Sequence, residues 1–275
     1  METSHITDLL AQFDAEQWQP YFQAKRLEFR GGGGCGAWNC KTENGVLYVV
    51  KSQNNPQDRP YGLPWKILTT ELICGRLGQL FDPIICPPVS VINIPDELVA
   101  GNNILYNGSE QVVVGPSFGS QLVDGMIETK AGGRIELVPF AQIARIIVFQ
   151  TWLRGEDVAA LVALDGSKSL SIDHGWYLTG SRWDTSVIAN PFSVLPVQIP
   201  QFQQQGELIE AQHYLNVLDE LDALSEIDIV RAFSAVPTEW GASLAFRTEL
   251  ASFVLKRRDL VKQAVSTIWK GATVC

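Results

Sequence analysis

The first part of the chain alternates between short apolar runs that suit strands and segments with helical spacing. Residues 6–24 repeat apolar side chains at helical spacing and predict one or two short helices. Strand-like runs follow at residues 25–29, 37–41 and 46–51. A glycine run separates the first two, and Asn44-Gly45 between the last two is a strong hairpin signal. The order predicted is therefore strand, glycine loop, strand, turn and strand.

A helix and another strand extend this pattern. Residues 54–64 have the composition of a loop, and residues 68–81 then carry apolar side chains at helical spacing. Prolines follow the helix, and residues 89–94 read as a further strand. Several strands with one long helix predict a small mixed β/α first lobe over residues 1–97.

The middle of the chain has a weaker pattern. The apolar run at residues 112–114 predicts a short strand, and the small residues 115–120 predict a turn or loop. Residues 140–153 are strongly apolar and predict a buried helix. A β-hairpin is predicted next, with a turn at Asp165-Gly166 between apolar runs at 161–164 and 170–173.

The last third of the chain is predicted to be mainly helical. Residues 185–205 are irregular and rich in Pro and Gln, whereas residues 206–270 have room and spacing for three or four helices. We therefore predict an α+β protein with two lobes. The second lobe, residues 98–275, is expected to be mainly helical.

Composition excludes several classes of function. The hydrophobic fraction of 46% and the charged fraction of 19% are those of a folded protein. No apolar run approaches the roughly 18 residues of a membrane span, and the N-terminus lacks a secretory signal, so we expect a cytoplasmic location and no membrane partner. The formal charge of −9 argues against direct nucleic-acid binding, which needs concentrated Lys and Arg. The five cysteines are irregularly spaced, and we interpret them as free thiols.

One ordered set of residues indicates a nucleotide site. The glycine run precedes a predicted strand that ends in Lys51, and Glu71 follows in the next helix. Glycines let a backbone close over phosphates, and a lysine on a buried strand can reach them. An opposite charge about 4 Å away keeps such a lysine protonated and oriented. The alternative is a surface lysine and a glutamate that are unrelated in space. The glycines assigned to phosphate binding are Gly31, Gly32, Gly33, Gly34 and Gly36.

Two aspartates supply the other candidate chemistry. Asp173 ends the hairpin and precedes His174-Gly175, where a carboxylate suits a magnesium ligand, although a turn aspartate bound to backbone donors is the alternative. Asp157 lies between the buried helix and the hairpin, where a catalytic loop would accept a proton from the acceptor hydroxyl. The composition around Asp157 is also that of a plain loop. We interpret His174 as a packing residue rather than a catalytic one.

Other nucleotide and hydrolase patterns do not fit. The glycine run lies between strands rather than opening a helix, which excludes a dinucleotide fingerprint. No Gly-Lys-Ser/Thr follows it, which excludes a Walker-type loop. The chain also lacks a Gly-x-Ser-x-Gly nucleophile elbow.

These residues resemble the HipA-like kinases, particularly their shorter bacterial branch. The resemblance spans about residues 22–183, and Ile172-Asp173-His174-Gly175 is its most specific segment. It implies a protein-kinase-like fold in which Lys51 contacts phosphates, Glu71 pairs with Lys51 and Asp173 holds magnesium. ATP and Mg²⁺ are the implied cofactors. The implied phosphate acceptor is a protein Ser/Thr or a small-molecule hydroxyl.

The predicted catalytic loop departs from the family pattern. Family loops usually read Asn-x-Asp-Arg, followed by a histidine or asparagine. Asp157 keeps its place, but Gly155 replaces the leading Asn, Val158 replaces the Arg, and the metal-binding asparagine falls near Leu161 or Val162. An aliphatic side chain offers magnesium no oxygen, and losing one oriented contact can cost on the order of 10²-fold in rate.

Three functions stay open at this point. The first is an ATP-dependent kinase, and the second is a pseudokinase that serves as a nucleotide-binding or protein-interaction module. The third is an interaction protein whose helical tail binds a partner. Lys51, Glu71 and Asp173 favour the first two, because all three residues are of the types that a nucleotide site needs.

Overall fold

The structure is a computed structural model of the 275-residue chain. It describes residues 1–16, 21–29, 37–52, 66–101, 113–129, 137–155, 159–180, 188 and 209–272. The phosphate-binding glycines predicted at Gly31 to Gly36 lie outside the described residues, and so does Asp157. The roles assigned to them therefore stay predictions.

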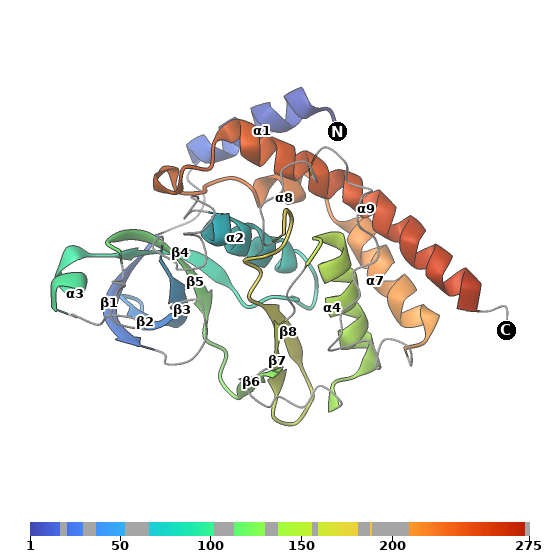
Figure 1. Cartoon of the computed structure of the whole chain (residues 1–275), viewed down its shortest axis with the longest axis horizontal. Helices are drawn as coiled ribbons and strands as arrows, with labels where there is room; N and C mark the ends of the chain where they lie inside the picture. Colours follow the sequence, from blue (N-terminus) through green and yellow to red (C-terminus); the bar gives the residue numbers. More distant parts are fainter. Residues whose placement is uncertain are drawn as a thin grey trace.

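A closed five-stranded barrel forms the N-terminal part of the fold (Figure 1). The β2–β3 hairpin turns at the predicted Asn44-Gly45, where Gly45 has a φ of 83°. Neighbouring strands are antiparallel except β1 and β4, whose parallel pairing closes the barrel. Around the barrel the strands are β1 (Phe22–Phe29), β2 (Trp38–Thr42), β3 (Leu47–Lys51), β5 (Gly115–Gln121) and β4 (Val89–Ile94).

Strand β5 corrects the prediction of a turn or loop at residues 115–120. This segment pairs with β3 along one edge and with β4 along the other. Its small residues reflect close packing rather than a turn, because a Cβ atom at Gly119 would lie 2.5 Å from the Ile92 side chain and 3.3 Å from Tyr48. Glycine inside a strand often marks such a close approach.

Helix α2 (Lys66–Gly78) lies against β4 and β5 of the barrel (Figure 1). It begins two residues before the predicted start and ends three residues before the predicted end. Every residue of α2 is buried. Leu68 and Leu72 pack with apolar side chains of the barrel, whereas Ile73 and Leu77 belong to the main core. The helix is therefore enclosed, and its polar side chains must find partners inside the protein.

The predicted buried helix and hairpin are both confirmed. Helix α4 (Phe140–Trp152) follows Pro139, and β7 (Ala159–Ala163) and β8 (Ser169–Ile172) form the hairpin beside it. Gly166, in the hairpin turn, has a φ of 73°. Strand β6 (Met126–Glu128) pairs with β7 and completes a three-stranded sheet.

Helices make up most of the remaining described chain. The long helix α9 (Leu244–Ala272) packs against α1 (Thr3–Glu16), α4, α7 (Ala211–Ala223) and α8 (Glu226–Arg231). The main apolar core lies among these helices (Figure 1). The predicted helical tail is confirmed for residues 209–270, but residues 22–24, predicted as helix, belong to β1. These elements are α1 (Thr3–Glu16), α3 (Asp96–Gly101), α7 (Ala211–Ala223), α8 (Glu226–Arg231), the 3₁₀ helix η4 (Thr238–Trp240) and α9 (Leu244–Ala272).

Mixed helix and strand content is therefore confirmed, while the division into lobes at residue 97 stays a prediction.

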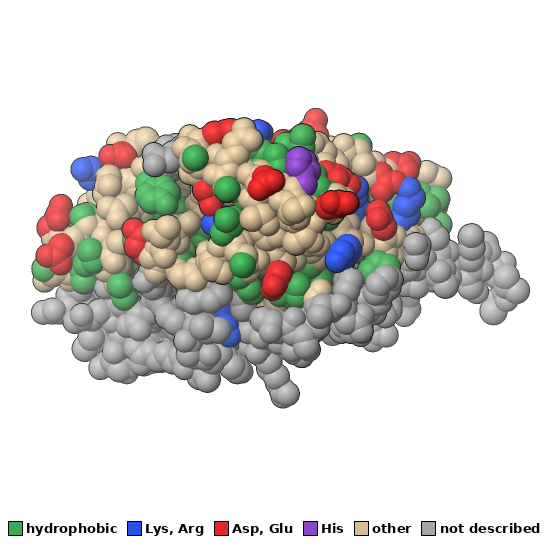
Figure 2. Space-filling view, turned by 90° about the horizontal axis from the view of Figure 1, so that it is seen from above, with side chains coloured by type: hydrophobic (Ala, Val, Ile, Leu, Met, Phe, Trp, Pro, Cys, Tyr) green, Lys and Arg blue, Asp and Glu red, His purple; other side chains and the backbone are tan. Residues whose placement is uncertain are grey.

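Within the described ranges, no helix combines the length and apolar character needed to cross a membrane. On the face in Figure 2, acidic and basic side chains are interspersed with apolar ones. Three of the five cysteines are described, and each is free and buried: Cys40, Cys74 and Cys86.

Candidate functional site

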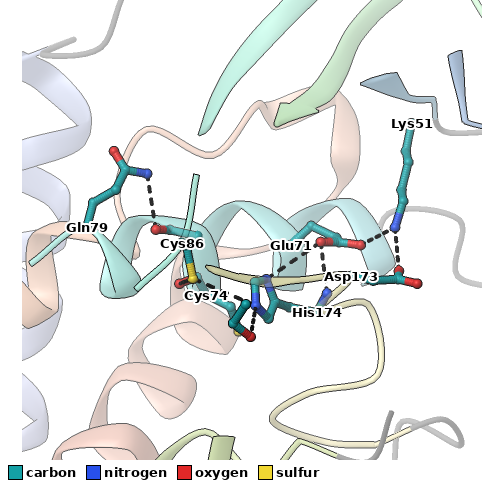
Figure 3. Close-up of polar contacts among 9 residues, drawn as sticks. Lys51, Glu71, Cys74, Gln79, Cys86, Asp173 and His174 are labelled. Atoms are coloured by element: carbon teal, nitrogen blue, oxygen red, sulfur yellow. Dashed lines mark hydrogen bonds and ion pairs between the residues drawn. The ribbon is translucent and has the colours of Figure 1, made fainter. Parts of the chain in front are cut away.

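Lys51 ends β3 between two carboxylates from distant parts of the sequence. Its ammonium group donates to Oε1 of Glu71 on α2, and to Oδ1 of Asp173 at 2.6 Å (Figure 3). The Lys51 side chain is only 9% exposed. A charge removed from water needs such paired partners. The lysine and glutamate are therefore not unrelated in space, and the structure brings together three of the predicted site residues.

The Glu71 carboxylate accepts hydrogen bonds through both oxygens. Oε1 accepts from Lys51, and Oε2 accepts the backbone N–H of His174 at 3.0 Å. Burial raises the pKa of the Glu71 carboxyl, and the adjacent Lys51 ammonium opposes that shift. Because both carboxylate oxygens are occupied by donors, Glu71 has one orientation here, and it holds Lys51 in one place.

Asp173 is placed by an unusual backbone conformation directly after β8. Its φ of 60° lies in the left-handed region, which aspartate tolerates better than most residues. The next glycine, Gly175, lets the segment approach α2, because a Cβ atom there would lie 2.9 Å from Cγ2 of Ile67. The Asp173 side chain is 29% exposed. Its carboxylate therefore both touches Lys51 and remains accessible from outside.

His174 lies behind the ion pairs. Its Nε2 is 3.0 Å from Oγ of Ser171 and 3.7 Å from Sγ of Cys86, and its ring meets the rings of Phe149 and Tyr177 edge-on. Burial lowers the pKa of His174 to about 3, against the attraction of the Asp173 charge. The imidazole is therefore neutral near pH 7, in keeping with its interpretation as a packing residue.

The backbone that leads to Asp157 is held by the C-terminal helix. Arg257 of α9 donates to the carbonyl oxygens of Thr151 at 2.6 Å and Trp152 at 2.8 Å, at the end of α4. The last carbonyls of a helix lack partners within it, and a cation there also suits the helix dipole. Arg257 thus holds the last turn of α4, which precedes the predicted catalytic loop in sequence.

Tyr177 occupies the space beside Gly155. A Cβ atom at Gly155 would lie 2.7 Å from Cζ of the tyrosine ring and 3.0 Å from two other ring atoms. The Gly155 N–H donates to the Gln150 carbonyl at 2.8 Å. Tyr177 was not singled out from the sequence. The basic cluster Lys256-Arg257-Arg258 is predicted from the sequence to be a solvated helix face, which is wrong for Arg257, because its side chain is fully buried. For Tyr177, the aromatic residues directly after His174-Gly175 were the available signal.

Residues 29–163 match the family model of the HipA-like kinases, just under half of the chain. The predicted resemblance to the HipA-like kinases is confirmed. The matched range includes Lys51, Glu71 and Asp157, and it ends before Asp173. The family match and the pairing of Lys51 with Glu71 are therefore two separate observations.

Solved structures similar to this chain have low sequence identity to it. One is a crystal structure of the Golgi casein kinase, with 10% identity and a TM-score of 0.48, covering 97% of this chain and 77% of that one. Another is the Golgi casein kinase with Mn/ADP bound, with 9% identity and a TM-score of 0.41, covering 96% and 76%. Both similarities are too low to assign chemistry to this chain. No curated protein matches it in sequence.

The HipA-like pattern is altered where a second metal ligand would follow Asp157. Val162 is buried in β7 and belongs to the main core, and Leu161 pairs with Leu170 of β8. Across the described part of the chain, no group of three or more His, Cys, Asp or Glu residues could hold a metal ion.

Proposed function

We propose that this HipA-like protein binds ATP with Mg²⁺ and transfers a phosphoryl group to a protein Ser/Thr or a small-molecule hydroxyl. The observation that carries the proposal is Lys51 held between Glu71 and Asp173. Phosphoryl transfer depends on positioned positive charge more than on covalent chemistry by the protein. An enclosed, oriented ammonium beside an accessible carboxylate meets that need.

Each site residue has a distinct role in this proposal. Lys51 donates to phosphate oxygens, and Glu71 keeps it oriented. Asp173 holds the magnesium ion together with phosphates and water, because Mg²⁺ is usually bound through one or two carboxylates. An ion held there would neutralise charge on the phosphates. The glycines at 31–34 and 36 close over the phosphates, and Asp157 accepts the proton of the acceptor hydroxyl.

A pseudokinase is the second candidate function, and two observations favour it. Val162 is buried where the family pattern has a metal-binding amide nearby, and Tyr177 fills the space beside Gly155, where the family has asparagine. Either change removes an oriented polar group from the transfer site, which lowers the rate of phosphoryl transfer. Nucleotide binding through Lys51 and Asp173 does not depend on these two positions.

Calorimetric titration with ATP, in Mg²⁺ and in EDTA, tests both candidates. We expect tighter binding with Mg²⁺, and we expect Asp173→Asn to lose about tenfold or more of that gain, since a charged ligand is removed. Asparagine is preferred to alanine because it tolerates the left-handed backbone at this position. The matched control is Asp165→Asn, in the exposed hairpin turn.

The rate of ADP release over several hours then separates the two functions. ADP release that Asp157→Asn abolishes supports the kinase. Mg²⁺-dependent binding without ADP release supports the pseudokinase. A wild-type protein that binds no ATP at millimolar concentration contradicts both.

A further inference from the structure

The helix that carries Glu71 is contacted by a segment from the far end of the chain. Helix α2 is buried along its whole length, between the barrel and the C-terminal helices (Figure 1). Residues 232–243, which join α8 to α9 and include η4, contact it there. We call residues 232–243 the brace segment.

Arg76 makes the polar contact between α2 and the brace segment. Its guanidinium group, on a side chain only 4% exposed, donates to the carbonyl oxygen of Ser234 and to that of Ala232 at 3.4 Å. A buried charge has few alternative partners, so these acceptors restrict where the arginine can lie. Arg76 is five residues beyond Glu71, on the same helix. Fixing Arg76 therefore restricts movement of the whole helix.

Trp240 makes the apolar contact. Its buried indole packs in one cluster with Leu68 and Leu72 of α2, which flank Glu71 in sequence, and with Phe118 of β5. The indole N–H donates to the Pro116 carbonyl at 2.9 Å. Trp240 thus links the barrel strand next to β3 with the turn of α2 that carries Glu71.

The brace segment is itself anchored to α1 and α9. Asp14 of α1 accepts two hydrogen bonds from Arg247, at 2.8 and 2.6 Å, and one from the Ala235 N–H at 2.8 Å. Arg247 also donates to the Phe233 carbonyl at 3.1 Å. Ala235 has a φ of 49°, a conformation that a residue with a Cβ adopts only when its surroundings enforce it. The segment therefore has anchors that do not involve α2.

We propose that the brace segment holds α2 in the position where Glu71 pairs with Lys51, so that the pair exists before any nucleotide binds. Arg76 and Trp240 are positioning residues of the candidate site, acting through Glu71. The inference rests on the proposed function only in the experiment that measures ATP affinity. It gives the helical tail a role at the site that nothing in its own sequence indicates.

Chemical labelling of Lys51 tests the brace without nucleotide. Arg76→Met removes the polar contact but keeps an unbranched apolar stem, and Trp240→Phe is a milder variant that keeps a ring and removes the N–H. At conditions where both variants are fully folded, we expect acetylation of Lys51, measured by peptide mass spectrometry, to be about fivefold faster or more, because the ammonium is less firmly paired with Glu71, one of its two carboxylate partners.

The matched control is Arg258→Met, which removes another largely buried arginine whose partners, the Leu224 carbonyl and Glu226, lie outside α2. We expect labelling within about twofold of the wild type in this variant. Wild-type labelling rates in Arg76→Met and Trp240→Phe would overturn the proposal. Equal acceleration in Arg258→Met would also overturn it, because the effect would then be general loosening.

A double-mutant cycle on ATP affinity provides the second test. If Trp240 acts through Glu71, Trp240→Phe weakens ATP binding about fivefold in the wild type and has no effect in the Glu71→Gln background. Equal losses in both backgrounds would overturn the proposal. A wild-type protein that binds no ATP refutes the proposed function. The labelling of Lys51 then tests by itself whether the brace segment positions α2.

Discussion

A methyl group added at residue 155 is expected to destabilise the protein, because Tyr177 already fills the space. In Gly155→Ala the new Cβ atom would lie 2.7 Å from Cζ of Tyr177 and 3.0 Å from its two neighbours. Carbon atoms in contact normally lie about 3.5–4.0 Å apart, so the ring must move by roughly 1 Å. It has little room, because Tyr177 is fully buried and the His174 ring lies 4.8 Å away, centre to centre.

The size of the loss follows from two opposing effects. Overpacking a buried site costs about 1–3 kcal/mol. Alanine also restricts the unfolded chain more than glycine does, which returns about 0.4–1 kcal/mol. The net loss is therefore about 1–2 kcal/mol. In a protein of this size, such a loss in stability lowers Tm by about 2–4 °C.

Thermal and urea unfolding, followed by circular dichroism, measure this loss. The control is the same substitution in a Tyr177→Leu background, where the ring is absent and Gly155→Ala should be neutral or slightly stabilising. An unchanged Tm for Gly155→Ala alone would refute the reasoning. So would an equal loss in the Tyr177→Leu background, because the tyrosine ring would then not be the cause.

Two further predictions concern the neighbours of this site. Burial lowers the pKa of His174 from 6.5 to about 3, so the unfolded chain binds a proton first as the pH falls. Stability should therefore decrease between about pH 6.5 and 3, by up to about 1.4 kcal/mol per pH unit, and urea unfolding of His174→Gln should show a shallower decrease; an identical pH profile would contradict this. Arg257→Met removes the guanidinium donors to the carbonyls of Thr151 and Trp152, of which the Thr151 carbonyl keeps only the Arg154 N–H at 3.4 Å, and should cost about 2–3 kcal/mol in urea unfolding, whereas exposed Lys256→Met should cost almost nothing. Equal losses in these two variants would show that Arg257 has no special role.

Local signals predicted many of the elements correctly. The hairpin between β7 and β8 was predictable because Asp165-Gly166 supplies a turn between two apolar runs, and Gly166 does adopt a positive φ. Helix α4 was predictable because its apolar side chains repeat at helical spacing. In both cases the pattern depends on residues close together in the chain.

Strand β5 was predicted wrongly because its local composition and its environment disagree. Gly115, Pro116 and Gly119 are common in turns, and nothing local opposes that interpretation. The strand exists because β3 and β4 supply hydrogen-bond partners on both edges, and because Ile92 leaves no space for a side chain at position 119. Both causes lie far away in the sequence.

The residues of the candidate site were predictable from the sequence, whereas their contacts were not. Residue type and order were sufficient to select Lys51, Glu71 and Asp173, because an oriented lysine needs a carboxylate and a metal needs an oxygen ligand. Their sequence could not show that one lysine contacts both acids, or that Asp173 adopts a left-handed backbone to do so.

The candidate chemistry can therefore be recognised from residue types and their order along the chain. Most of the geometry depends on contacts between residues more than a hundred positions apart, such as Arg76 with the brace segment and Arg257 with the end of α4. The contact of Tyr177 with Gly155 is local by comparison. The long-range contacts form only when the chain has closed large loops. Their energy comes from burial and from hydrogen bonds between buried arginines and carbonyl oxygens, which no local pattern specifies.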